Sequence, residues 1–361
     1  MLKTLIATLT ICSCAVLSAT AQGFGVPKAL YSDNGYFNHL DVSVNTGTTG
    51  IGVDMSAPIG DYVKVRLGAS YMPRFEMTST FRVQVGDSLE RKYDKNGNRI
   101  ETKFDKLSGM LKSFTGYEVD DEIDMKVKPT FYNYRLLFDV HPFVDKRWHF
   151  TAGVYVGSKE IGRAYNSTKD MTSLMAVSMY NMMYRRVENN EPLFFFNDQL
   201  NYTLPLDARD IVLQMLKNYG RMGVQLGTYT YDGPIIYNEW DEMEYDDEGN
   251  PLREFSKGDP YMMVPDEKTG MVTVTAKAKH AWRPYAGFGY SGSISKDGRT
   301  ELSFDTGVFF WGGKPHVYTH DGTDLVYDVE GIRGKVGRYV KAVKAFPVFP
   351  VLEVRITRRI F

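Results

Sequence analysis

Cysteine is nearly absent from the sequence, which has only Cys12 and Cys14 among its 361 residues. Both lie in a segment with the layout of a secretory signal peptide: a basic start, an apolar run over residues 5–17 and a small-x-small cleavage site that ends at Ala21. We therefore expect cleavage after Ala21; a lipoprotein signal modified at Cys14 is the alternative. The exported chain, residues 22–361, then has no thiol, which excludes disulfides, cysteine nucleophiles and cysteine metal sites.

Long apolar runs and an excess of one charge are also missing. No run of about 20 apolar residues follows the signal segment, so the sequence offers no transmembrane helix. Lys and Arg number 43 against 44 Asp and Glu, which gives no support for a nucleic-acid partner. A chain without such a helix can cross a membrane only as a closed β-barrel, because every backbone polar group must be paired inside the hydrocarbon.

What the sequence does have is a repeated alternation of apolar and polar residues. In the clearest example, Val63, Val65 and Leu67 alternate with Lys64 and Arg66, which is the two-residue period of a β-strand. The pattern recurs often enough to predict eight strands. Their expected positions are residues 38–46, 49–58, 62–73, 130–141, 147–158, 282–294, 299–312 and 348–361.

The connections between these strands alternate in length. Three of them are long, residues 74–130, 159–281 and 313–347, and all three fall on the same side of the predicted sheet. Short turns on one side and long loops on the other are typical of bacterial outer-membrane barrels. The sequence therefore predicts an all-β fold, an eight-stranded antiparallel up-and-down transmembrane β-barrel with long extracellular loops. A soluble β-sandwich is the alternative.

Short turns predict which inward residues face each other. A type II′ turn at residues 47–48 would place Asp41 opposite Asp54. A three-residue turn after the next strand would place Asp54 opposite Arg66, and a shift of two residues would place it opposite Lys64. Either arrangement sets a base beside the carboxylates and so keeps them ionised.

A second turn predicts another register. Residues 296–298, Lys-Asp-Gly, fit a three-residue hairpin loop whose glycine adopts the left-handed conformation. This loop would place Gly289 opposite Asp305 and Tyr290 opposite Phe304, with each pair on one face of the sheet.

The inward face of the predicted barrel collects charges of both signs. We expect a lumen charge network of Asp41, Asp54, Lys64, Arg66, Arg135, Asp139, Arg283, Glu301, Asp305, Glu353 and Arg355. The interior of an eight-stranded barrel is only just wide enough for side chains to fill it. We therefore predict a salt-bridged, filled lumen and not a conducting pore.

Several blocks of the sequence resemble the small outer-membrane β-barrel proteins of Bacteroidota, a largely uncharacterised family. The blocks are TGTTGIGVDMSAPIGDYVKVRLGASYMPRF, LLFDVHPF, HFTAGVYVG, PYAGFGYSG, SFDTGVFFWG and PVLEVRITRRIF. The resemblance covers the strand blocks and not the loops. It implies two partners: outer-membrane lipid, and the barrel-assembly machinery, which would recognise the C-terminal strand ending at Phe361. The apolar parity of that strand is carried by Ile356 and Ile360, so either a bulge near Arg358 resets the register or Phe361 does not face lipid.

The third outward loop contains two helical patterns. Residues 206–219 have helix-capping signals at both ends, and residues 171–184 are rich in methionine. We expect the methionine stripe to pack against a neighbour, although methionine surfaces can also bind partners. Residues 239–248 contain seven acids, which we interpret as a solvated loop; the alternative, a divalent-cation site, lacks a fixed ligand geometry. We expect no metal site.

A basic segment precedes the last strand. Its cations are expected to contact lipid phosphates near the outer leaflet. They are Arg333, Lys335, Arg338, Lys341 and Lys344.

Groupings that would indicate an enzyme are weak. His316, His320 and Asp321 lie close in sequence, but no positioned nucleophile accompanies them. His149 and Asp139 could meet inside the barrel, at its periplasmic end. We therefore predict no catalytic residues and no cofactor. The expected function is a structural or surface-interaction protein of the outer membrane whose surface partner the sequence does not identify. The alternatives are a barrel enzyme acting on lipid A or peptides, and a small pore.

Overall fold

The computed structural model describes most of the chain beyond the N-terminal segment. The described residues are 37–86, 90–188, 193–194, 201–202, 214, 216, 218–237, 241–245, 249–266, 268–345 and 347–360. The predicted signal peptide and Phe361 lie outside them. So do most of the predicted helix at 206–219 and half of the predicted acidic loop, namely residues 239–240 and 246–248.

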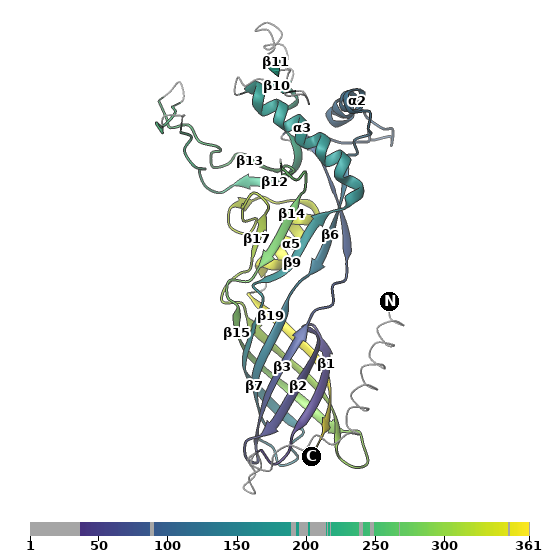
Figure 1. Ribbon diagram of the computed structural model, residues 1–361, viewed down its shortest axis with the longest axis vertical. Helices are drawn as coiled ribbons and strands as arrows, with labels where there is room; N and C mark the ends of the chain where they lie inside the picture. Colours follow the sequence, from purple (N-terminus) through teal and green to yellow (C-terminus); the bar gives the residue numbers. More distant parts are fainter. Residues whose placement is uncertain are drawn as a thin grey trace.

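Eight antiparallel strands close into a barrel, which confirms the predicted fold class. In chain order they are β1 (Asp41–Gly47), β2 (Gly50–Pro58), β3 (Val63–Tyr71), β7 (Tyr132–Val140), β8 (Trp148–Gly157), β15 (Trp282–Ser293), β16 (Thr300–Phe310) and β19 (Val348–Arg359). Each strand pairs with its neighbours in chain order, and β19 closes the barrel against β1. The three long segments all leave from one rim (Figure 1).

The apolar and polar residues that alternate in the sequence lie on opposite faces of the barrel wall. Along β2, Ile51, Val53 and Met55 are exposed on the outside, while Asp54 and Ser56 are buried inside. The same pattern repeats along β7, where every second residue is buried. A wall with an apolar outside and a charged inside is the reverse of a soluble barrel, in which the apolar side chains would fill the interior.

Two of the predicted registers are wrong by two residues. Thr48 and Thr49 form the β1–β2 turn, and Asp41 lies opposite Ser56, not Asp54. The β2–β3 turn is longer than three residues, so Asp54 lies opposite Gly68. Because side chains alternate with a period of two, a shift of two keeps every residue on its predicted face and changes only its partner.

The third register is confirmed. Gly289 lies opposite Asp305 and Tyr290 opposite Phe304, and Gly298 has the left-handed backbone that the turn requires. The pairing of β19 with both neighbours continues to Arg358 and Arg359 without a register shift. A bulge near Arg358 is therefore absent from the described part of this strand.

Beyond the rim, the described parts of the long segments fold into two larger sheets and one two-stranded sheet. Strands β4 (Met77–Arg82), β6 (Glu122–Pro129), β9 (Glu160–Asn166), β14 (Thr273–Lys277) and β17 (His316–Thr319) form one sheet. Strands β5 (Gln84–Val85), β12 (Met222–Tyr229), β13 (Pro260–Met263) and β18 (Val329–Glu330) form the other, and β10 (Leu193–Phe194) pairs with β11 (Asn201–Tyr202). Figure 1 shows these sheets stacked beyond the barrel, along its long axis.

Helices occur in all three long segments, whereas the sequence predicted them in one. Those with described bounds are α2 (Lys103–Thr115), the short 3-10 helix η2 (Thr168–Asp170), α3 (Met171–Glu188) and α5 (Gly334–Ala345). Thr102 caps α2 through a reciprocal pair of hydrogen bonds with Asp105, and Gly116 ends it. None of the described helices is long and apolar enough to span a membrane.

The external sheets and helices share one hydrophobic core, and we call residues 74–130, 159–281 and 313–347 together the external domain. Val83, Val177, Leu226 and Val329, one or more from each of the three segments, are all buried in this core. Helix α3 packs on it through Leu174, Val177 and Tyr180, while Met175 on the opposite side is 59% exposed. The other methionines of the stripe, Met171, Met179, Met182 and Met183, are partly buried, and none of the five belongs to the buried core.

Candidate functional site: the filled lumen

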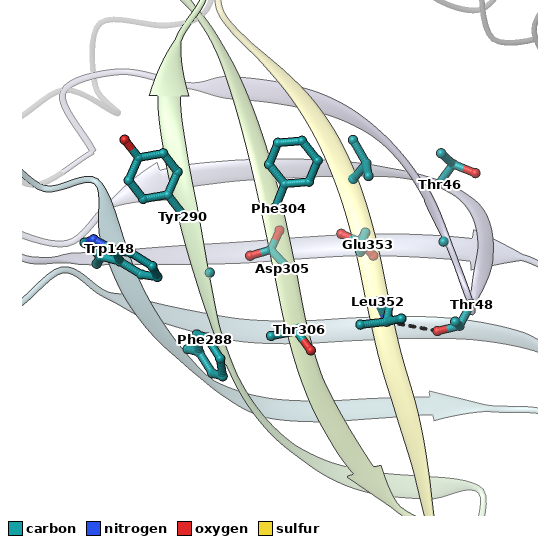
Figure 2. Close-up of a pocket in the computed structure, with 13 residues that line it drawn as sticks. Thr46, Thr48, Trp148, Phe288, Tyr290, Phe304, Asp305, Thr306, Leu352 and Glu353 are labelled. Atoms are coloured by element: carbon teal, nitrogen blue, oxygen red, sulfur yellow. Dashed lines mark hydrogen bonds between the residues drawn. The ribbon is translucent and has the colours of Figure 1, made fainter.

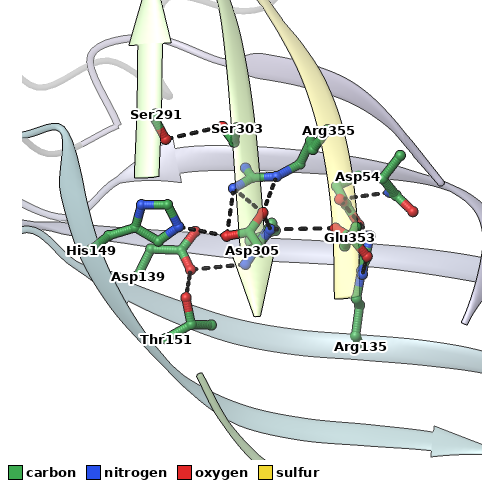
Figure 3. A network of polar contacts seen from close by, with 12 residues as sticks. Asp54, Arg135, Asp139, His149, Thr151, Ser291, Ser303, Asp305, Glu353 and Arg355 are labelled. Carbon is green, nitrogen blue, oxygen red and sulfur yellow. Dashed lines mark hydrogen bonds and ion pairs between the residues drawn. The ribbon is translucent and has the colours of Figure 1, made fainter. Parts of the chain in front are cut away.

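Arg135 on β7 lies at the centre of the lumen and has no solvent-exposed side-chain surface. Its Nε atom lies 2.6 Å from Oδ1 of Asp54 on β2, and its Nη1 atom lies 2.5 Å from Oε2 of Glu353 on β19 (Figure 3). Asp54 also accepts a hydrogen bond from Asn45. One guanidinium thus links strands on opposite sides of the barrel, through charge-assisted hydrogen bonds.

Two more arginines continue this network. Arg66 donates to Asp139 at 2.9 Å, and its Nη1 atom lies 3.8 Å from Asp305 and 3.9 Å from Glu353. Arg355 donates to Asp305 at 3.1 Å. Four buried carboxylates, Asp54, Asp139, Asp305 and Glu353, are therefore held by three arginines.

A threonine and two histidines lie in the same layer of the lumen as these ion pairs. Thr151 donates to Asp139 at 2.6 Å. The Nε2 atom of His149 lies 2.6 Å from Oδ1 of Asp305, and its ring lies against that of His141, with the ring centroids 5.3 Å apart. His149 and Asp139 both face the lumen, but the hydrogen bond of His149 is with Asp305, which β16 brings to this histidine.

The remaining predicted charges lie at the edges of the lumen. Lys64 contacts Asp41 at 3.2 Å near the rim that carries the short turns, and Arg359 lies 3.6 Å from the same carboxylate. Glu301 is only partly buried, and it forms no ion pair with the described residues. Arg283 is buried but has no carboxylate partner within the described chain.

An aromatic layer lies next to the charge layer, and sequence reasoning missed it. Tyr155, Tyr285 and Phe309 point inward from β8, β15 and β16. The centroid of the Tyr155 ring lies 5.2 Å from that of Tyr285 and 5.5 Å from that of Phe309. Phe309 stacks on Phe349 at 4.8 Å. Tyr155 also connects the layers, because Arg135 donates to its hydroxyl at 3.3 Å. The available signal was that these aromatics occupy the polar parity of their strands.

Arg283 belongs to this aromatic layer. Its guanidinium lies over the ring of Trp311 at 4.9 Å and that of Phe309 at 5.5 Å. It donates to the side-chain oxygen of Asn133 and to the carbonyl oxygen of Ser158. Cation–π contacts and neutral acceptors therefore stabilise this charge, which the sequence analysis had placed in the charge network.

The histidines of the external domain do not form a triad. His316 contacts Asp324 at 2.5 Å, whereas Asp321 accepts hydrogen bonds from Thr319 and Tyr261. Burial raises the pKa of Asp321, but these hydrogen bonds and others lower it by more, so its pKa lies below the usual value. The carboxylate is thus a structural acceptor for Thr319 and Tyr261 and not the hydrogen-bond partner of His316.

The basic segment forms helix α5, which the sequence analysis did not predict. Val336, Val340 and Val343 face the core of the external domain. Four of the five predicted cations, Arg333, Lys335, Arg338 and Lys341, are exposed, and Lys344 is partly buried. The helix ends at Ala345 and β19 begins at Val348, so this cationic face lies just beyond the outer rim of the barrel (Figure 1).

No family model and no curated protein matches the sequence. Among solved structures, the chain is similar to CarO2 and CarO of Acinetobacter baumannii, each at 11% identity, with TM-scores of 0.33 and 0.34 over 89% of this chain and 98% and 97% of those chains. It is also similar to a major outer membrane protein from Thermus thermophilus, at 11% identity and a TM-score of 0.27, over 89% of this chain and 99% of that one. Because these TM-scores lie below 0.5, we transfer neither activity nor ligand from these proteins.

Proposed function

We propose that the protein is an outer-membrane β-barrel whose filled lumen serves as an anchor for a folded external domain, and that this domain interacts with a partner at the cell surface. The observation that carries the proposal is that the barrel and the external domain have interiors of different kinds. The barrel has a charged, ion-paired interior, while the external domain has a hydrophobic core of its own.

The outside of the barrel supports insertion into a membrane. Large exposed apolar side chains cover seven of its eight strands, for example Met55, Leu67, Phe138, Phe288 and Leu352, and each of these is at least 40% exposed. In water this belt would expose a large apolar surface to the solvent. In a bilayer the same side chains contact acyl chains, and the closed sheet leaves no backbone edge unpaired.

The packing of side chains in the lumen supports a role as an anchor and not as a channel for water or solutes. The charge layer is cross-linked from β2, β3, β7, β16 and β19, and the aromatic layer lies between it and the external domain. Water or a solute would have to displace Arg135 from two carboxylates and separate the stacked rings of Phe309 and Phe349. Breaking a buried ion pair is costly, because it leaves uncompensated charge.

The external domain supports a role in surface interaction. It extends an arm, described for residues 231–237, 241–245 and 249–258, that is held by isolated β-bridges, such as Tyr237 with Met243 and Tyr245 with Pro251. The side chains of Tyr237 and Tyr245 are 51% and 57% exposed. Tyrosine is enriched in recognition surfaces, because its ring gives a large contact area with few rotatable bonds.

A fractionation experiment tests the proposal. Expressed in a Gram-negative host, the protein is expected to fractionate with the outer membrane, to require detergent for extraction, and to migrate faster on unheated gels because the barrel stays folded. Protease added to intact cells should cut within the arm at residues 231–258 and leave the barrel strands protected. A chain that stays soluble without detergent, or an arm that is cut only after cell lysis, would contradict the proposal.

A further inference from the structure

The strands of the barrel do not all end at the rim that carries the external domain. Five neighbouring strands, β16, β15, β8, β7 and β3, continue past it as β17, β14, β9, β6 and β4, in the same order in the external sheet as in the barrel. The other three, β1, β2 and β19, end at the rim. There the hydroxyl of Thr48, at the tip of the β1–β2 hairpin, accepts a hydrogen bond from the backbone of Leu352 on β19 (Figure 2). The described part of this sheet is therefore open on the side above these three strands.

Helix α5 lies on this open side. It leads directly into β19, because Ala345 and Val348 are three residues apart. In its first turn, Lys335 donates to the carbonyl oxygen of Thr80 on β4, an edge strand of the sheet, at 3.4 Å. The helix packs in the core of the external domain through three valines, Val336, Val340 and Val343. It therefore covers the open side of the sheet and turns its other side away from the core.

The side of α5 that faces away from the core is cationic. Because successive residues of a helix are about 100° apart, Lys335, Arg338 and Lys341 lie opposite the valines, and Lys344 lies at the flank. The first three side chains are exposed, and Lys344 is partly buried. Arg338, Lys341 and Lys344 form no ion pair with the residues that the structure describes. The described chain thus supplies no carboxylate that neutralises these three cations.

Aromatic side chains at the rim show how far α5 lies from the hydrocarbon. Tyr71 lies opposite Tyr132, Trp282 begins β15, and Phe310 lies opposite Val348; these four aromatic residues are at least 44% exposed. Such rings mark the boundary between hydrocarbon and headgroups. Three residues of chain span at most about 10 Å, and the headgroup layer of one leaflet is roughly 5–8 Å thick. In the inserted barrel, the last turn of α5 therefore lies at or just above the headgroups.

We propose that the cationic side of α5 binds phosphate groups of lipid headgroups, in the leaflet on the side of the external domain. Arg and Lys form charge-assisted hydrogen bonds with phosphate oxygens, and an anionic membrane surface attracts nearby cations. At this depth the helix borders on headgroups and not on the medium, which favours a lipid over an acidic protein or a free anion. The proposal rests on the membrane anchor proposed above, and it adds a polar contact with the membrane to the apolar belt.

A fluorescent label tests the position of α5. Residues 22–361 contain no cysteine, so Ala345→Cys, at the exposed end of α5, gives the exported chain a single labelling site. The matched control is Lys106→Cys on α2, at the end of the external domain away from the barrel (Figure 1). In phosphatidylcholine vesicles with a spin label on the headgroup, the label at position 345 should lose most of its fluorescence, and the label at position 106 should lose little. Equal quenching at the two positions would overturn the proposal.

Removal of charge tests the binding of phosphate. The α5 variant is Arg338→Gln, Lys341→Gln and Lys344→Gln; the matched control, Arg91→Gln, Lys95→Gln and Lys106→Gln, removes the same charge from exposed positions in and before α2. Native mass spectrometry of the full chain in detergent compares phosphatidic acid with phosphatidylcholine of the same acyl chains. The wild type and the control should bind phosphatidic acid about tenfold more tightly than phosphatidylcholine, and the α5 variant should lose this preference.

The remaining outcomes separate the alternatives. Retention of the preference by the α5 variant would overturn the proposal, and so would an equal loss in the control, which would show a general effect of charge. Displacement of the lipid by an equal concentration of inorganic phosphate would assign the cations to a free anion instead. The mobility of both variants on unheated gels checks that the barrel has folded. A barrel that inserts but shows no preference leaves the membrane anchor intact, whereas a chain that does not insert contradicts both proposals.

Discussion

Arg135→Met is expected to lower the free energy of unfolding of the barrel by about 3–5 kcal/mol, because it leaves two buried carboxylates without their cation. Arg135 contacts both Asp54 and Glu353. Asp54 has no second ion pair among the described residues, and the other cation near Glu353, Arg66, lies 3.9 Å away. Methionine matches the length of the arginine stem, so the variant removes the charge and keeps most of the packing. The measurement is the urea midpoint at which the heat-modifiable, fast-migrating form is lost in detergent.

Two companion variants show whether the loss comes from unpaired charge. Adding Asp54→Asn and Glu353→Gln to Arg135→Met removes the orphaned charges, and most of the stability should return. Lys64→Met breaks the partly exposed pair with Asp41 and should cost only about 1 kcal/mol or less. If Arg135→Met and Lys64→Met had equal effects, the central position of Arg135 in the network would be wrong.

Val177→Asp is expected to unfold the external domain and leave the barrel folded. Val177 on α3 has no exposed surface and packs in the core of the external domain. An aspartate there would be a buried charge without a partner, which places the variant among the exceptional substitutions that cost more than about 4 kcal/mol. Limited proteolysis of the purified protein should degrade the external segments rapidly, while the gel mobility of the folded barrel stays unchanged.

Met175→Asp is the matched control, two residues away on the exposed side of the same helix. Its charge remains in water, so protease resistance should equal that of the wild type. Loss of barrel mobility in Val177→Asp would contradict the separation of the two cores. Unchanged protease resistance in Val177→Asp would contradict the burial of this face of α3.

The faces of the barrel could be predicted from the sequence, but the partners of its charges could not. The two-residue period fixes whether a side chain points in or out, and this held even where Asp41 and Asp54 were placed in the wrong register. Contacts such as that of Arg135 with Asp54 cross the lumen between strands that are not neighbours. They depend on how the sheet closes, which no local pattern encodes.

The external domain was predicted as long loops with two helices in one of them, and its shared core was missed for a related reason. Its core joins Val83, Val177 and Val329 from three segments far apart in sequence. Short strands such as β5 and β18 have too few residues to show a period. The apolar spacing of Val336, Val340 and Val343 did carry a helical signal, but the cations between them led to the interpretation of the segment as merely basic.

The account's central claim is that ion pairs and stacked rings close the lumen of a membrane-inserted barrel. Recording from planar bilayers that contain the purified wild-type protein tests it most directly, with incorporation confirmed by protease protection of the strands. We predict a flat current across the accessible voltage range, with no unitary steps. Reproducible steps of a single size, present in the wild type and altered in Arg135→Met, would show that ions pass through the barrel and would contradict the account.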